Sequence, residues 1–269
     1  MKNRLYISFS LLSVIFFLFP FIYMIFISFT SEPSALGEPI SWTLTNYNGI
    51  LTNSSLHFID YLKNSLIIAF TSSIVCVFLA SMAAYVITRF NFKGKKLLML
   101  TVLGVSLFPQ ISIIGYLFKM MSAMGIINTY GALIPPYIAW ILPLSLWILV
   151  SYFSALPKEL DSAALIDGCN HWQVLTKIIF PIAIPGLFST FLLAFIYVFN
   201  EFMFALMLTT DFHSRTIPVG VALFHGLHGE VPWGNIMAAS TITTIPLIII
   251  ILIYQKQLIN GLTKGAVKG

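Results

Sequence analysis

The segment PKELDSAALIDGCNHWQVLTKIIFPIAIPG, residues 157–186, is a partly charged island in a chain that is otherwise strongly apolar. Pro157 suits the start of a helix, because the N–H that proline lacks has no partner in a first turn. Gly168 suits a helix end, because glycine readily adopts the left-handed conformation found there. The spacing therefore predicts a short helix over residues 158–167 that Gly168 terminates.

A second short helix is predicted directly after the first. Asn170 and Gln173 have the spacing of a capping box, and the helix over residues 171–180 is expected to end at Pro181. The small residues 162–164 allow another protein to approach the backbone of the first helix closely. This helix–glycine–helix unit, residues 157–182, is called the elbow. Its pattern suits a docking surface, and an ordinary connecting loop is the alternative interpretation.

The composition places the chain in a membrane. Apolar residues make up 58% of it and charged residues only 9%, whereas a soluble domain carries roughly 25% charged residues. The two cysteines, Cys76 and Cys169, form neither a CxxC motif nor a disulfide framework. The first apolar run is longer than the core of a signal peptide, so we expect it to be retained as a membrane span.

Six stretches are long and apolar enough to cross a bilayer. They are residues 7–29, 65–88, 97–121, 131–152, 183–209 and 236–256. We predict an all-α membrane protein with one transmembrane domain, residues 1–269, and the elbow between the fourth and fifth helices. Prolines are expected to break the third and fourth helices at Pro109, Pro135, Pro136 and Pro143. The segments 31–64 and 211–235 are expected to be irregular loops.

The basic residues predict the orientation. With the amino terminus inside the cell, eleven of them face the cytoplasm: Lys2, Arg4, Arg89, Lys93, Lys95, Lys96, Lys158, Lys177, Lys256, Lys264 and Lys268. Three face outward: Lys63, Lys119 and Arg215. Because short cytoplasmic loops are enriched in lysine and arginine, both termini and the elbow are predicted to be cytoplasmic.

The elbow also resembles a known signature, the "EAA" loop of ATP-binding-cassette importer permeases. The matching positions are Ser162-Ala163-Ala164, Gly168 and Ile178-Ile179-Phe180-Pro181, with Ser162 where the family has Glu and Phe180 where it has Leu. Further segments resemble the maltose-type carbohydrate-uptake permeases. They are Trp42–Tyr47, Glu159-Leu160, Ile166–Gly168, Asn200–Phe202 and the tail Gly261–Gly269.

This resemblance implies a subunit of a sugar importer in a bacterial or archaeal cell membrane. Its partners would be a second permease chain, two ATPase subunits that bind ATP and Mg²⁺, and an extracellular sugar-binding protein that contacts the outer loop 211–235. This chain has no P-loop of its own. The ATPase-coupling residues implied are Glu159, Asp161, Ser162, Ala163, Ala164, Asp167 and Gly168, with Glu159 or Asp161 in place of the missing Glu. Tail residues Gly265, Ala266 and Lys268 would reach the ATPase interface.

Glu201 is a carboxylate within a predicted span, and it follows Asn200. A charge in a bilayer is costly, so this pair is expected to face the bundle interior or an aqueous path. A structural hydrogen bond to a neighbouring helix is the equal alternative to a role in sugar passage. Aromatic candidates for stacking on a sugar are Tyr116, Tyr137, Trp140, Trp147 and Tyr197, of which Tyr137 and Trp140 are assigned to the path with Asn200 and Glu201.

Other function classes fit less well. A secondary transporter driven by an ion gradient would need inverted repeats and buried coupling charges. An intramembrane protease at Ser106 would need a histidine base in another span, and none of the five histidines lies in a predicted span. His225 and His228, with His213 nearby, are expected to be solvated loop residues, not metal ligands. An importer of glycerol phosphate is the alternative substrate class.

Overall fold

The computed structural model describes residues 2–31, 41–224 and 231–263. Helices dominate this part of the chain. They are α1 (Lys2–Ser28), α2 (Thr45–Thr52), α3 (Phe58–Arg89), α4 (Lys95–Ser106), α5 (Gln110–Ala123), α6 (Tyr130–Ser154), α7 (Glu159–Ile166), α8 (His171–Gln173), α9 (Phe180–Phe199), α10 (Met203–Leu208), α11 (Ile217–Ala222) and α12 (Trp233–Thr263), with a 3₁₀ turn η1 (Ser54–Leu56) and a π-helical segment η2 (Val174–Ile179).

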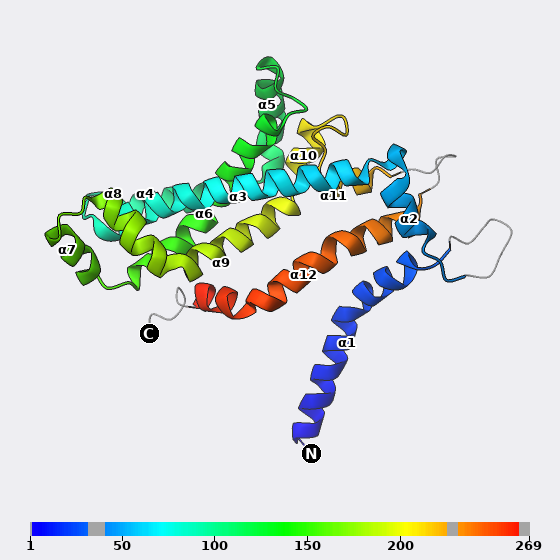
Figure 1. Cartoon of the computed structure of the whole chain (residues 1–269), viewed down its shortest axis with the longest axis horizontal. Helices are drawn as coiled ribbons and strands as arrows, with labels where there is room; N and C mark the ends of the chain where they lie inside the picture. The colour runs from blue at the N-terminus through cyan, green and yellow to red at the C-terminus, as the bar shows by residue number, and fades with distance from the viewer. Residues whose placement is uncertain (1, 32–40, 225–230, 264–269) are drawn as a thin grey trace.

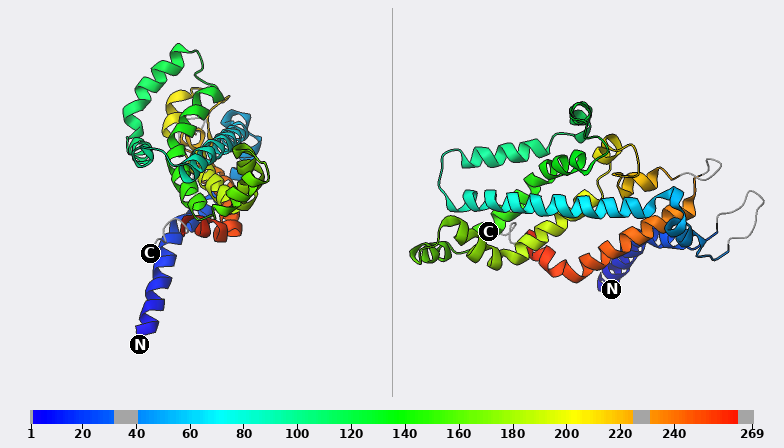
Figure 2. Two further views of the ribbon diagram at one scale, coloured as in Figure 1. Left: turned by 90° about the vertical axis from the view of Figure 1, so that its left-hand side faces the viewer. Right: turned by 45° about the horizontal axis from the view of Figure 1, so that its top comes forward.

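Helices α3, α6 and α9 form the centre of the bundle, and α12 packs against α9 (Figure 1). Helix α1 leaves the bundle and contacts α12 near its own C-terminal end (Figure 2). Helices α7 and α8 lie at one end of the molecule, and α2 and α11 lie at the other (Figure 1). Within the described ranges, five helical stretches are long and apolar enough to cross a membrane, and the bent pair α4–α5 is a sixth candidate. The prediction of a multi-span helical membrane protein is therefore confirmed.

The third predicted span, residues 97–121, is interrupted at Pro109, as expected. The chain forms α4 and α5, whose axes are bent by 85° at the break before Gln110. Pro109 has ψ of 133° and extended backbone, and a proline cannot supply the N–H that would continue the helical ladder. Of the four prolines expected to break helices, Pro109 is the one that does.

The predicted breaks in the fourth helix are wrong. Helix α6 is continuous across Pro135, Pro136 and Pro143. Membrane helices tolerate proline where neighbouring groups satisfy the freed carbonyls, and α6 is packed between α3 and α9. The segments predicted as irregular loops are also more ordered than expected, because they contain α2 and α11.

The fifth span begins earlier and ends sooner than predicted. The helix that was expected to stop at Pro181 continues from α8 through η2 into α9, so that residues 171–199 form one apolar stretch. The π-helical segment shifts the hydrogen-bond register just before the proline, where the regular ladder is interrupted in any case. The stretch then ends at Phe199, and residues up to 209 belong to a break and to α10.

Small residues let the helices approach closely. On α3, Ser72, Cys76 and Ala80 are fully buried, as expected where membrane helices pack through small side chains. Among the described glycines, Gly220 in α11 shows the tightest fit, because a Cβ built on it would overlap the ring of Tyr61.

Gly220→Ala is expected to lower the free energy of unfolding by about 1–3 kcal/mol, the usual cost of overpacking. Tyr61 is only 6% exposed, so its ring has little room to move. Gly115→Ala is the matched control, since a Cβ at Gly115 meets nothing within 4 Å. Thermal unfolding in detergent measures both variants, and equal midpoints would contradict the close contact between α11 and α3.

Candidate functional site: the elbow and the outer half of the bundle

The first helix of the elbow, α7, ends in a Schellman motif. Gly168 has φ of +85°, and its N–H donates to the carbonyl of Leu165 at 3.1 Å. The N–H of Cys169 donates to the carbonyl of Ala164 at 3.0 Å. This pair of bonds defines the motif and favours glycine at the left-handed position. The predicted role of Gly168 is confirmed.

The second half of the elbow begins with the predicted capping box. The Asn170 side chain accepts from the N–H of Gln173, and the Gln173 side chain accepts from the N–H of Asn170, both at 2.9 Å. The following residues Val174, Leu175 and Ile179 are buried against α3 and α6. The elbow is thus packed onto the bundle and does not hang from it as a free loop.

Arg89, the last residue of α3, joins the elbow to two long helices. Its Nε lies 3.0 Å from Oδ2 and 3.1 Å from Oδ1 of Asp161 in α7. Its Nη1 donates to the carbonyls of Phe153 and Leu156 at the C-terminal end of α6, both at 3.3 Å. The two charged side chains are 7% and 11% exposed. We call this arrangement the Arg89 clamp.

One side of α7 is buried against the bundle, and the other side is exposed. Asp161 and Ala164 are buried, whereas Ser162 and Ala163 are exposed. Ile166 is 86% exposed, which is unusual for an isoleucine on a packed element. The remaining predicted coupling residues Glu159, Asp167 and Gly168 are also exposed.

Sequence reasoning placed Asp161 and Ala164 on the docking side, and the structure turns both toward the bundle. Asp161 is engaged with Arg89, so Glu159 is the exposed carboxylate next to the position where the family has Glu. Sequence reasoning missed Arg89, which it treated only as a cytoplasmic positive charge. Its partner lies 72 residues away, and no local pattern indicates such a pair.

Glu201 does not lie within a continuous membrane helix. It follows the end of α9, it is 7% exposed, and its carboxylate accepts from the N–H of Phe204 at 3.0 Å and from that of Ala205 at 3.4 Å. A carboxylate at the start of a helix satisfies free N–H groups and favours the helix dipole. Glu201 therefore caps α10. This agrees with the alternative in which Glu201 makes a structural hydrogen bond to a neighbouring helix.

The other predicted path residues lie close to this cap. Tyr137 and Trp140 of α6 both contact the Phe204 ring, with ring centroids 6.1 Å and 5.8 Å away. The indole N–H of Trp140 donates to the hydroxyl of Tyr197. Asn200 is exposed, and its amide donates to the carbonyl of Ile196 at 2.7 Å. The fold brings Tyr137, Trp140 and Glu201 together, while Asn200 faces outward beside them.

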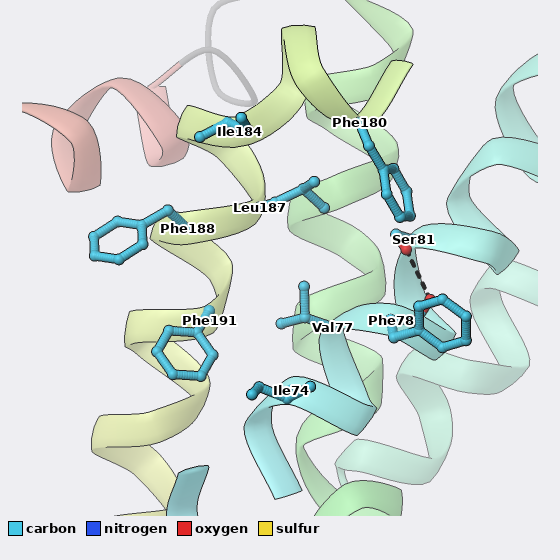
Figure 3. A pocket seen from close by; sticks show the side chains of 9 residues that line it. All are labelled: Ile74, Val77, Phe78, Ser81, Phe180, Ile184, Leu187, Phe188 and Phe191. Atoms are coloured by element: carbon cyan, nitrogen blue, oxygen red, sulfur yellow. Dashed lines mark hydrogen bonds between the residues drawn. The ribbon is translucent and has the colours of Figure 1, made fainter. Parts of the chain in front are cut away.

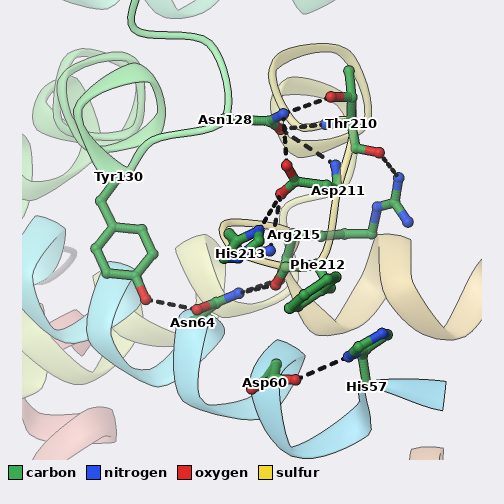
Figure 4. Close-up of polar contacts among 10 residues, drawn as sticks. All are labelled: His57, Asp60, Asn64, Asn128, Tyr130, Thr210, Asp211, Phe212, His213 and Arg215. Carbon is green, nitrogen blue, oxygen red and sulfur yellow. Dashed lines mark hydrogen bonds and ion pairs between the residues drawn. The ribbon is translucent and has the colours of Figure 1, made fainter. Parts of the chain in front are cut away.

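A polar network fixes the loop that follows α10 (Figure 4). Asn64 of α3 donates to the carbonyls of Phe212 and Arg215 at 2.9 and 3.0 Å. Asn128, with φ of +63°, donates to Thr210 and Asp211. These bonds hold the loop against the ends of α3 and α6 and keep α11 in place.

Among the described residues no group of three metal-binding side chains gathers. His213 lies 3.3 Å from Asp211, and His225 and His228 lie outside the described residues, as do Gly265, Ala266 and Lys268. The hydroxyl of Ser106 donates to the carbonyl of Leu103 at 2.7 Å.

The described residues of the bundle line two hollows that bear on function. The first lies between α3 and α9 and is lined by apolar side chains such as Val77, Phe78, Leu187 and Phe191 (Figure 3). Its one hydroxyl, that of Ser81, donates to the carbonyl of Phe78 at 2.7 Å. This hollow suits acyl chains or the apolar face of another helix, because it has few groups that could bind a polar ligand.

The second hollow lies between the end of α9, α11 and α12. It has a volume of about 320 Å³ and is lined by both apolar and polar side chains, Asn200 among them.

The described fold is a bundle of helices, several of them long enough to cross a membrane, with the elbow packed at one end. Residues 76–264 match the family of binding-protein-dependent transport system inner membrane components, and the chain belongs to this family. This confirms the resemblance to sugar importer permeases of the ATP-binding-cassette class.

Relatives with known names match this chain over most or all of its length. The trehalose/maltose transport system permease protein MalG of Thermococcus litoralis is 55% identical over 100% of this chain and 98% of its own length. The trehalose transport system permease protein SugB of Mycobacterium tuberculosis is 39% identical over 86% of this chain and 84% of its own length.

A solved structure supports the fold. It is a bacterial ABC transporter involved in the import of the acidic polysaccharide alginate, and one of its chains matches with a TM-score of 0.76 at 18% identity, covering 95% of this chain and 97% of that one. Family membership in binding-protein-dependent transport systems leaves no reason to retain the gradient-driven transporter or the protease.

Proposed function

We propose that this chain is the permease subunit through which an ATP-driven importer carries a di- or oligosaccharide into the cell. The observation that carries the proposal is the exposed face of α7, held rigidly by the Arg89 clamp. A displacement of α7 by a partner is transmitted through Asp161 and Arg89 to the ends of α3 and α6. The full-length identity to a trehalose/maltose permease supports the substrate class.

We infer the partners from the family to which the chain belongs. ATP and Mg²⁺ would be bound by two ATPase subunits, which dock on Ser162, Ala163 and Ile166, with Glu159 supplying the nearby negative charge. A second permease chain would complete the pathway, and an extracellular binding protein would deliver the sugar to the outer loops. The termini and the elbow would face the cytoplasm, in agreement with the distribution of basic residues.

Purification of the tagged chain from its source membranes tests the proposal. We expect two ATPase subunits and one further permease chain to be purified with each copy. Vesicles that contain the complex should take up radiolabelled trehalose or maltose only when ATP is present on the side of the membrane where the ATPase subunits lie. A chain that is purified alone, and transports either sugar on an ion gradient without ATP, would refute it.

A further inference from the structure

The second hollow combines an apolar wall with hydroxyl groups. Phe199, Pro218 and Leu247 are among the apolar residues that line it. The polar side chains are those of Asn200, Ser240, Thr243 and Thr244. Ligand pockets in proteins are typically apolar with a few polar groups that fix orientation, and their volumes begin near about 300 Å³. The hollow of about 320 Å³ has this character.

The hydroxyls of α12 differ in their availability. Thr241 and Thr243 donate to the carbonyls of Met237 and Ala239, four residues earlier, at 2.7 and 3.0 Å. This is the usual arrangement for threonine within a helix. For Ser240 and Thr244, in contrast, the described part of the chain provides no such bond. These two residues are spaced i, i+4, so they lie on one face of α12, and both line the hollow.

Asn200, directly after α9, adds an amide to the lining of the hollow. The Nδ2 of Asn200 donates to the carbonyl of Ile196, while its Oδ1 has no partner among the described residues and remains available as an acceptor. Among the side chains that line the hollow, two hydroxyls and one amide oxygen thus have no partner among the described residues. None of the residues that line it is charged.

We propose that this hollow is a saccharide subsite, in which Ser240, Thr244 and Asn200 bind hydroxyl groups of the neutral sugar that the importer carries. A neutral wall with uncommitted donors and acceptors matches a neutral polyhydroxyl ligand. An anionic sugar phosphate would instead need a cation or a set of N–H donors. The subsite lies toward the end of the bundle that carries α2 and α11, opposite to the elbow (Figure 1). This inference rests on the proposed function.

Removal of the two hydroxyls tests the subsite. In vesicles with the complete importer, Ser240→Ala combined with Thr244→Val should raise the trehalose or maltose concentration for half-maximal uptake about tenfold, the effect of losing two hydrogen bonds. Thr241→Val is the matched control, because its hydroxyl bonds Met237 and it does not line the hollow. An unchanged half-maximal concentration in the double variant would overturn the subsite, and so would a change in the amount of partner permease that is purified with it.

Protection from a thiol reagent tests the site without transport. Thr244→Cys is placed in a chain with Cys169→Ser, since Cys76 is buried and Cys169 is partly exposed. Saturating trehalose or maltose should slow its modification by a maleimide at least fivefold, and glycerol 3-phosphate should not. Absence of protection by a sugar that the unmodified complex transports would overturn the subsite alone. No ATP-dependent uptake of any saccharide by the unmodified complex would instead refute the proposed function.

Discussion

Arg89→Ala should abolish ATP-driven saccharide uptake and lower the free energy of unfolding by about 3–5 kcal/mol, the cost of breaking a buried ion pair. The substitution leaves the carboxylate of Asp161 buried without its cation, and it also removes the donor to two carbonyls of α6. Thermal unfolding of the purified chain and uptake by vesicles measure the two effects.

Two controls distinguish the effect of losing the Arg89 clamp from the effect of losing a positive charge. Lys93→Ala, at an exposed position close to the same end of α3, should change stability by no more than about 0.5 kcal/mol, because exposed sites rarely matter more. Arg89→Met combined with Asp161→Leu should recover part of the stability, since an apolar pair often replaces a buried ion pair at little cost. If Arg89→Ala were as stable as Lys93→Ala, the clamp would not be the link between the elbow and α3.

Ala163→Trp should reduce ATP-driven uptake at least about tenfold and leave the melting temperature unchanged. Ala163 is exposed on α7, so a large side chain there lies outside the packed part of the described chain and blocks a close-fitting partner. A binding loss of about 1.4 kcal/mol already gives a tenfold effect. The measurements are uptake by vesicles and the number of ATPase subunits that are purified with the chain.

Ala164→Trp is the matched comparison. Ala164 is 6% exposed and packs within the cluster that includes Val174 and Ile179. A large side chain there should lower the stability of the chain itself by about 1–3 kcal/mol through overpacking. Normal uptake by Ala163→Trp would exclude the exposed face of α7 as the surface that binds the ATPase subunits.

The local features of the elbow could be predicted from sequence because short-range rules determine them. Gly168 terminates α7 since only a residue that tolerates the left-handed conformation fits there, and Asn170 with Gln173 satisfies the N–H groups of the next helix within four residues. The orientation of α7 could not be predicted in this way. It depends on Arg89, whose contact with Asp161 is set by tertiary packing.

The break after α9 was missed for a related reason. Residues 183–209 are apolar enough for one span, and Glu201 was read as a charge inside it. The structure shows that the carboxylate caps a new helix, α10, which apolar periodicity does not reveal. The hydrogen bonds between Asn128 and residues 210–211 likewise join segments about eighty positions apart in the sequence, beyond the reach of motif reasoning.

In the proposed mechanism, a cytoplasmic ATPase binds the exposed face of α7 and moves this helix. Modification of Ile166→Cys by a membrane-impermeant maleimide, in a chain with Cys169→Ser, tests it most directly, because Ile166 is 86% exposed. We expect modification in inside-out vesicles stripped of the ATPase subunits, and protection when those subunits are bound. Modification of Ile166→Cys from the outside of intact cells would contradict it.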